Sequence, residues 1–192
     1  MQRARGHTLS ELLLACAIGL VVTGALLVDI ASLHRTQRMQ RAWADLQEHE
    51  RLAFALLDQA LRSACALRVR DGGLLLRQRH RCGLPGASGG AHWWVANGAL
   101  LCRAADGGDR QPARALLGAS PVALHDLRLR FGVELRGKPV RRQLVAPDAL
   151  DALGATARVR SVEIGLRFVA PGLPPTEWQR VFAWSPQPGD CG

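Results

Sequence analysis

The residues with the most distinctive chemistry lie at the start of the chain. Basic residues come first, a carboxylate follows, and an apolar segment comes last. A basic hexapeptide, residues 1–6, precedes His7-Thr8-Leu9-Ser10-Glu11, and an apolar run follows at residues 12–28. These 17 residues carry no charge, and that length is close to the minimum for spanning the hydrocarbon core of a membrane. A carboxylate is costly in lipid, so Glu11 at the mouth of the run should have an ionic partner or a specific role.

Three kinds of export signal could contain this segment. A secretory signal peptide would use Arg3 and Arg5 as its basic region, but the run is long, starts beside Glu11 and lacks a small-x-small site at its end. A lipoprotein signal would place Cys16 after the apolar run, whereas most of the run follows Cys16. The third kind of signal is cut before the apolar segment, which then remains on the mature chain.

The third kind of signal accounts for the basic residues, for Glu11 and for the long apolar run. Arg5-Gly6 followed by His7-Thr8-Leu9-Ser10-Glu11-Leu12-Leu13 resembles the class III signal of type IV pilins and pseudopilins. The resemblance implies that prepilin peptidase cleaves between Gly6 and His7, that His7 is N-methylated, and that Glu11 acts in assembly. The family usually has phenylalanine where this chain has His7.

Retention of the apolar segment would make the protein a single-pass inner-membrane protein with its head in the periplasm. Residues 1–6 are the leader, residues 7–33 the transmembrane or filament-core helix, and residues 34–192 the head. Arg3 and Arg5 would stay in the cytoplasm, as the positive-inside rule expects. In a filament, Glu11 could pair with the N-terminal ammonium of a neighbouring subunit, which would offset the cost of burying the carboxylate. An ordinary signal anchor, with Glu11 at the headgroups, is the alternative.

The cysteines follow the same division of the chain. Cys16 lies in the apolar run, and the other four fall in the part that would be exported: Cys65, Cys82, Cys102 and Cys191. Four cysteines in an oxidising compartment predict two disulfides and leave three connectivities open. His80, Cys82, His92 and Cys102 match no zinc-ligand spacing well. We therefore expect disulfides and no metal.

A formal net charge of +9 raises the question of nucleic acid. The positive charge is almost entirely arginine, Lys138 being the only lysine. The arginines are scattered along the sequence, with no dense run and no arginine–aromatic stacking motif. The pattern therefore does not favour nucleic-acid binding, which we keep as a minority hypothesis.

The helix should continue beyond the apolar run, over residues 8–64. No proline or glycine occurs between Ser32 and Ala64, and apolar residues recur at spacings of three and four, which predicts an amphipathic helix over residues 34–64. Its buried stripe should comprise Trp43, Leu46, Ala53, Phe54, Leu57 and Leu61. The segment from Gln47 to Leu57, followed by Leu61-Arg62-Ser63-Ala64-Cys65, resembles PilW-type minor pilins of type IV pili.

After Asp71-Gly72-Gly73 the apolar period becomes two, which predicts strands. We expect them at residues 74–78, 92–96, 99–103, 127–135, 162–168 and 178–184, with Asn97-Gly98 as a hairpin turn. Residues 83–90 and 104–112 read as loops, and residues 147–157 as a short helix or loop. The predicted fold is α+β, with a long helix packed on an antiparallel sheet over residues 72–192. By resemblance this is the pilin fold.

Catalytic motifs are absent from the sequence: it has no nucleophile elbow, Walker loop, His-Glu-x-x-His or dinucleotide glycine pattern. Four loop aspartates could bind calcium, but each pair offers too few ligands: Asp106, Asp109, Asp148 and Asp151. We expect no cofactor and no enzymatic activity.

The resemblance implies a minor pilin that acts in pilus initiation or at the pilus tip on the cell surface. Its partners would be other minor pilins, the major pilin, prepilin peptidase and the inner-membrane assembly platform. The alternatives are a J-type minor pseudopilin of a type II secretion system and a membrane-anchored DNA-binding or adhesive module.

Overall fold

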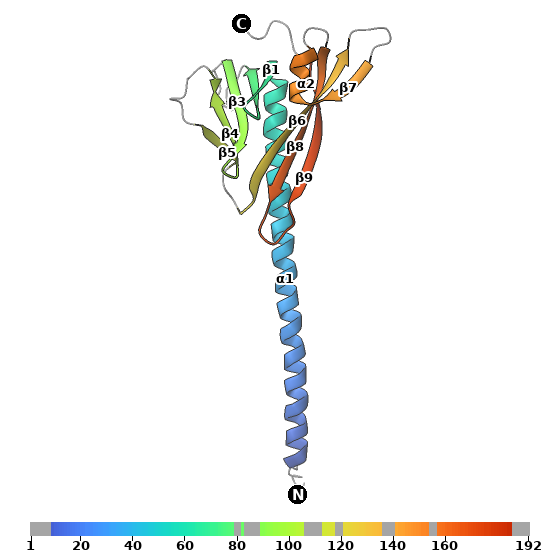
Figure 1. Cartoon of the computed structure of the whole chain (residues 1–192). Coiled ribbons are helices and arrows are strands. Elements are labelled where there is room, and N and C mark those ends of the chain that lie inside the picture. Colours follow the sequence, from blue (N-terminus) through green and yellow to red (C-terminus); the bar gives the residue numbers. More distant parts are fainter. Residues whose placement is uncertain are drawn as a thin grey trace. The chain divides into compact units, whose positions relative to one another are not determined.

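The computed structural model describes residues 9–78, 82, 89–105, 113–117, 121–135, 141–153 and 157–185. The chain divides into two compact units, Met1–Arg41 and Ala42–Gly192. The helix α1, Leu9–Arg62, crosses the boundary between these units (Figure 1). Gly6, His7 and Cys191 lie outside the described residues, as do most of the two predicted loops at residues 83–90 and 104–112.

Helix α1 has nearly the predicted bounds of residues 8–64. A run without proline or glycine from Ala25 to its end favours one uninterrupted helix. Arg62, in the last turn, complements the negative end of the helix dipole. The buried stripe starts later than predicted, because Trp43 is 36% exposed. The buried residues of α1 are Leu46, Ala53, Phe54, Leu57, Ala60 and Leu61.

The first sheet is five-stranded and antiparallel, in the order β1-β2-β3-β4-β5. Its strands are β1 (Ala64–Arg70), β2 (Gly73–Gln78), β3 (Gly89–Ala96), β4 (Ala99–Ala104) and β5 (Arg114–Leu117). Asn97-Gly98 joins β3 to β4 with φ angles of 52° and 75°, which are those of the type I′ turn. This confirms the predicted hairpin. Asp71-Gly72 turns β1 into β2 in the same way, with φ angles of 48° and 70°.

The second sheet is four-stranded and antiparallel, in the order β7-β6-β8-β9. Its strands are β6 (Ala123–Leu135), β7 (Arg141–Val145), β8 (Ala157–Val169) and β9 (Thr176–Ala183), and α2 (Pro147–Leu153) connects β7 to β8. Val162, Ile164 and Leu166 are fully buried, and the residues between them face outward. The alternation read from the sequence is thus confirmed in β8, as it is in β6.

The structure corrects the sequence prediction in three respects. The strands form two sheets where one was predicted. Strands β1, β5 and β7 were not predicted, because they are short or continue directly from the helix. Finally, Gly89 and Gly90 were assigned to a loop, but they open β3 and pair with Gln78 and Arg77 of β2.

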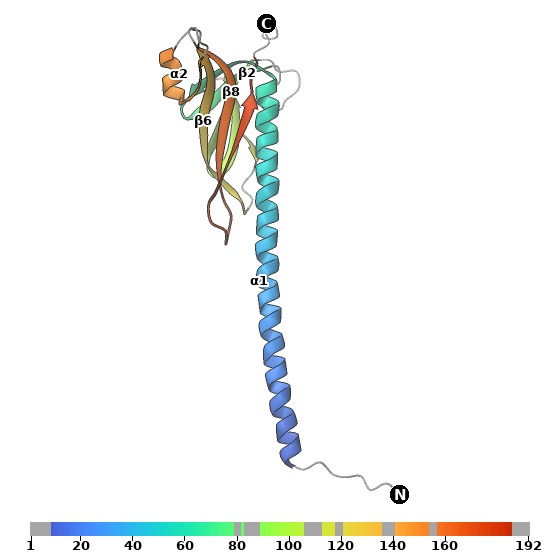
Figure 2. The same cartoon turned by 90° about the vertical axis from the view of Figure 1, so that its right-hand side faces the viewer.

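One hydrophobic core joins both sheets to the part of α1 that lies in the second unit. Phe54 from α1 and Phe131 and Phe168 from the four-stranded sheet are its largest fully buried side chains. Leu74, Leu76 and Leu100 enter the core from the five-stranded sheet. Figures 1 and 2 show both sheets beside the last turns of α1. The predicted α+β class, with a long N-terminal helix followed by antiparallel β-structure, is confirmed.

Candidate functional site

Glu11 lies in the first turn of α1 and its side chain is exposed. A carboxylate is favoured there by the positive end of the helix dipole. The predicted cleavage and methylation positions, Gly6 and His7, precede the described residues. The structure therefore places Glu11 at the start of the helix, immediately before the apolar segment.

The apolar segment of α1 is exposed along its whole length in the isolated chain. By length and composition, α1 could cross a membrane. Hydroxyl groups in this segment and just after it bond within the helix: Thr23 Oγ1 donates to the Gly19 carbonyl over 2.7 Å, and Ser32 Oγ donates to the Asp29 carbonyl over 2.8 Å. Such internal bonding is what a polar group needs in an apolar environment. The segment is suited to anchor the protein in a membrane.

The cysteine chemistry is concentrated in the head. Cys82 and Cys102 form a disulfide that closes a loop between β2 and β4. Cys65 is also disulfide-bonded, and Cys16 is a free, exposed thiol on α1. Because the two sulfur atoms of Cys82 and Cys102 are bonded to each other, they are not available as a thiolate pair for the zinc site considered above.

Metal ligands do not gather elsewhere in the described part of the chain, which contains no group of three His, Cys, Asp or Glu side chains placed to hold an ion. Of the loop aspartates, Asp148 lies in the first turn of α2, and Asp106 and Asp109 lie outside the described residues.

One ion pair ties the second sheet to the helix. Arg180 Nη2 of β9 lies 2.7 Å from Glu50 Oε1 of α1, and the Glu50 side chain is only 13% exposed. The Arg180 guanidinium also lies over the Phe54 ring, 4.7 Å from its centroid. These two contacts fix β9 against the predicted amphipathic stripe by charge and by cation–π attraction.

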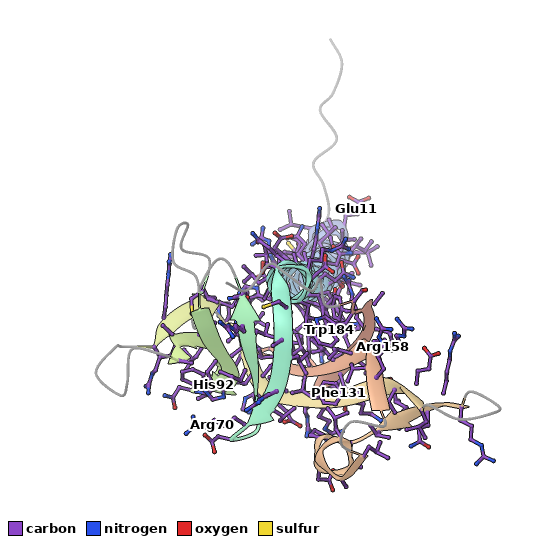
Figure 3. All side chains as sticks on the ribbon, turned by 90° about the horizontal axis from the view of Figure 1, so that it is seen from above. Glu11, Arg70, His92, Phe131, Arg158 and Trp184 are labelled. Carbon is purple, nitrogen blue, oxygen red and sulfur yellow. A yellow bond between two sulfur atoms is a disulfide. The ribbon has the colours of Figure 1, made fainter. Side chains whose placement is uncertain are left out.

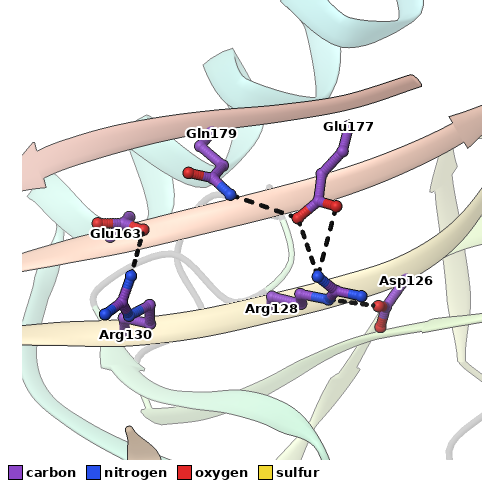
Figure 4. Close-up of polar contacts among 6 residues, drawn as sticks. All are labelled: Asp126, Arg128, Arg130, Glu163, Glu177 and Gln179. Atoms are coloured by element: carbon purple, nitrogen blue, oxygen red, sulfur yellow. Dashed lines mark hydrogen bonds and ion pairs between the residues drawn. The ribbon is translucent and has the colours of Figure 1, made fainter. Parts of the chain in front are cut away.

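The outer face of the four-stranded sheet carries a ladder of arginine–carboxylate pairs (Figure 4). Arg130 of β6 faces Glu163 of β8 over 3.7 Å. Arg128 contacts Asp126 over 3.0 Å and reaches Glu177 of β9 over 3.3 Å, crossing β8 at Gly165. We refer to these pairs, together with Arg160–Glu134, as the ion-pair ladder.

Glu134 and Arg160 make the tightest contact of the ladder, with 2.7 Å between Glu134 Oε2 and Arg160 Nε. The hydrogen bond from Arg160 lowers the pKa of Glu134 below its ordinary value, and the positive charges of Arg160, Arg142 and Arg158 act in the same direction. The carboxylate form of Glu134 is therefore stabilised in the fold.

The outer face of the five-stranded sheet carries a different cluster, which the sequence did not reveal. His92 and Trp94 of β3 stack with their ring centroids 5.0 Å apart and 22° between their planes. The Arg103 guanidinium of β4 lies 5.5 Å from the centroid of the Trp94 ring. The sequence shows no local arginine–aromatic motif, but the β3–β4 hairpin brings together Trp94 and Arg103, which are nine positions apart.

Residues 1–27 match the family model described as the prokaryotic N-terminal methylation motif. The chain therefore carries a prokaryotic N-terminal methylation motif. The match covers Gly6, His7 and Glu11 and most of the apolar run, the region on which the resemblance was based.

Among solved structures, the chain is similar to a type IV-like pilin from Thermus thermophilus. The sequences are 18% identical, the alignment covers 72% of this chain and 96% of the other, and the TM-score is 0.45. No curated protein sequence matches the chain.

Proposed function

We propose that this pilin-like protein is a minor pilin of a type IV pilus, a structural subunit rather than an enzyme. The observation that carries the proposal is the methylation motif over residues 1–27, placed directly before a helix that is 54 residues long. Cleavage between Gly6 and His7 would leave that helix whole. The mature protein would then be anchored by residues 7–33 and expose its head in the periplasm.

The disulfides support export of the head. Disulfides form and persist in oxidising compartments such as the periplasm, and the Cys82–Cys102 disulfide ties the connection between β2 and β3 to β4. The chain has five cysteines, of which Cys16 is free. We assign Cys191, the remaining cysteine, as the partner of Cys65. Peptide mapping without reduction should then yield a Cys65–Cys191 peptide pair, and a Cys65–Cys65 dimer would overturn the assignment.

The role of Glu11 follows from its position. An exposed carboxylate beside an apolar segment is costly in lipid, and that cost is offset when a neighbouring subunit supplies an ammonium group. The methylated N-terminus of another subunit would carry such a group. We therefore propose that Glu11 sets the register of this subunit against its neighbours in the pilus and in the initiation complex, with other minor pilins and the major pilin as partners.

The proposal is tested first by the intact mass of the protein recovered from membranes, with and without prepilin peptidase. A chain that begins at His7, retains the apolar segment and carries one methyl group is the expected product. A product cut near residue 30, or one that does not depend on the peptidase, would contradict the proposal.

The assembly role is tested by Glu11→Gln, which removes the charge and keeps the shape of the side chain. We expect the variant to insert into the membrane normally and to enter pili at less than about a tenth of the wild-type level, because 1.4 kcal/mol of lost pairing is a factor of ten. Cys16→Ala, an uncharged change on the same helix, is the matched control and should assemble normally. Equal incorporation of Glu11→Gln and wild type would indicate a plain anchor.

A J-type minor pseudopilin of a type II secretion system shares the processing signal and is the alternative. The helix sequence that resembles PilW-type minor pilins favours the pilus. Deletion of the gene should therefore reduce surface piliation and leave secretion of exoproteins intact, and the opposite pattern would assign the protein to secretion.

A further inference from the structure

The two sheets differ in the charge of their described residues. The five-stranded sheet, over residues 64–78, 89–105 and 113–117, has five arginines and one acid, Asp71. The four-stranded sheet and its connections, over residues 121–135, 141–153 and 157–185, have eight arginines and six acids. Four of these six acids lie in the strands of the second sheet and two lie in α2, so that sheet has one acid for every two arginines, whereas the first sheet has one acid for five arginines.

The positive charge of the first sheet adjoins the aromatic cluster. The strand registers align Arg68 with Leu75, Leu75 with His92, and His92 with Arg103. One row of side chains therefore crosses four strands with arginine at both ends and the His92–Trp94 stack beside it. At about 4.8 Å between strands, the row spans about 14 Å.

The stack is held in place by the sheet beneath it. His92 Nε2 donates to the Arg70 carbonyl over 3.0 Å, so the ring crosses β2 to reach β1. The His92 ring passes over β2 at Gly73. A Cβ atom added at this position would come within 2.7 Å of His92 Nε2 and still closer to the Trp93 carbonyl oxygen. Figure 3 shows His92 and Arg70 on the outer side of these strands. His92, Trp94 and Arg103 are half-buried, so part of each remains in contact with solvent.

Planar rings on an open sheet face, surrounded by arginines, provide the two interactions that single-stranded nucleic acid requires. Bases stack on aromatic side chains and on guanidinium planes, and phosphates are neutralised by arginine. A purely acidic partner would use the arginines but would gain nothing from the rings.

We propose that the outer face of the five-stranded sheet binds single-stranded nucleic acid. The His92–Trp94–Arg103 stack meets the bases, and Arg68 meets the phosphates. Arg70 lies beside Arg68 on the same strand face, and its guanidinium is paired with Asp71 over 3.3 Å. The proposal concerns the head alone and is independent of the N-terminal processing.

The test uses the full chain in detergent and a fluorescein-labelled oligothymidylate, with fluorescence anisotropy measured between 50 and 200 mM salt. Wild-type affinity should fall as salt rises. Arg68→Gln should weaken binding and make the slope of log affinity against log salt shallower by about 0.7, the value for one phosphate contact on a single strand. Arg167→Gln removes the same charge from an exposed position of β8 and should leave affinity within about twofold of wild type. Equal weakening by the two variants would overturn the proposal.

The role of the rings is tested separately. Trp94→Leu should weaken binding about fivefold or more without changing the salt slope, and Trp94→Phe should retain most of the affinity. If Trp94→Leu does not fold, His92→Gln removes a ring from the same stack and should give the same result. Unchanged affinity in the ring variants, or competition by inorganic polyphosphate as strong as that by the oligonucleotide at equal charge, would show that the face recognises charge alone and would overturn the proposal.

Discussion

On the outer face of each sheet, a long side chain crosses a neighbouring strand at a glycine, but the two crossings make different interactions. In the four-stranded sheet Arg128 crosses β8 at Gly165 to reach Glu177. In the five-stranded sheet His92 crosses β2 at Gly73 to reach the Arg70 carbonyl. The first crossing joins a charge to an opposite charge, and the second sets an aromatic ring beside further cations. In the ion-pair ladder, carboxylates neutralise the arginines, which is typical of a solvated structural surface. The aromatic stack contains no carboxylate, so the first sheet keeps an excess of positive charge.

The largest expected effect is that of Gly73→Ala, because the two glycines differ in the space around them. A Cβ at Gly73 would collide with backbone and with His92, whereas a Cβ at Gly165 would meet Arg128 and Glu177 at 3.4 and 3.5 Å, which is ordinary contact. We expect Gly73→Ala to lower the free energy of unfolding by about 1–3 kcal/mol and Gly165→Ala to change it by less than about 1 kcal/mol. Thermal unfolding of the two variants measures the difference, and equal costs would contradict the comparison.

A somewhat smaller effect is expected where the four-stranded sheet meets the helix. Arg180→Ala removes the contact with Glu50, which is largely buried, and the cation–π contact with Phe54. The loss should be about 1–2 kcal/mol in the free energy of unfolding. Denaturant unfolding measures it. Glu50→Ala should cost less, because Arg180 then keeps its position over Phe54, and a larger cost for Glu50→Ala would mean that the ring contact contributes little.

The ion-pair ladder itself should contribute less still. Arg130 is 56% exposed and lies 3.7 Å from Glu163, which is 15% exposed. At this distance, and with the arginine in solvent, such a pair contributes about 0.2–1 kcal/mol. Arg130→Ala should lower stability by no more than that, and the difference from wild type should shrink in 1 M salt because the charges are screened. A cost that persists in high salt would indicate packing of the arginine stem instead.

The smallest effect is expected from pH acting on Glu134. Its pKa is lowered in the fold by the hydrogen bond from Arg160, so its carboxylate stabilises the fold above the ordinary glutamate pKa of about 4.3. That contribution is lost as the pH falls through the lowered pKa of the folded state. Wild type should therefore lose slightly more stability than Glu134→Gln between pH 4 and 2. Parallel pH profiles for the two proteins would show that the Arg160 contact carries no net stability.

Local sequence patterns were sufficient to predict many of the secondary-structure elements. Three patterns depend only on short-range sterics and burial. They are the run without proline or glycine up to Arg62, the Asn97-Gly98 turn, and the strict alternation in β6 and β8. Strand β1 was missed because it starts two residues after α1 ends, and its Leu67 and Val69 could continue a helical stripe. The signal that could have revealed it is Asp71-Gly72, a dipeptide suited to a type I′ turn.

By itself the sequence determined the N-terminal methylation motif, because its basic residues, Glu11 and the apolar run are adjacent in the chain. Only the tertiary structure decided which arginines are neutralised. Arg128 meets Glu177 across 49 residues, and Arg103 meets Trp94 across a hairpin. Strand register brings such residues together, and register is set by the whole hydrophobic pattern of a sheet and not by the sequence around any one charge.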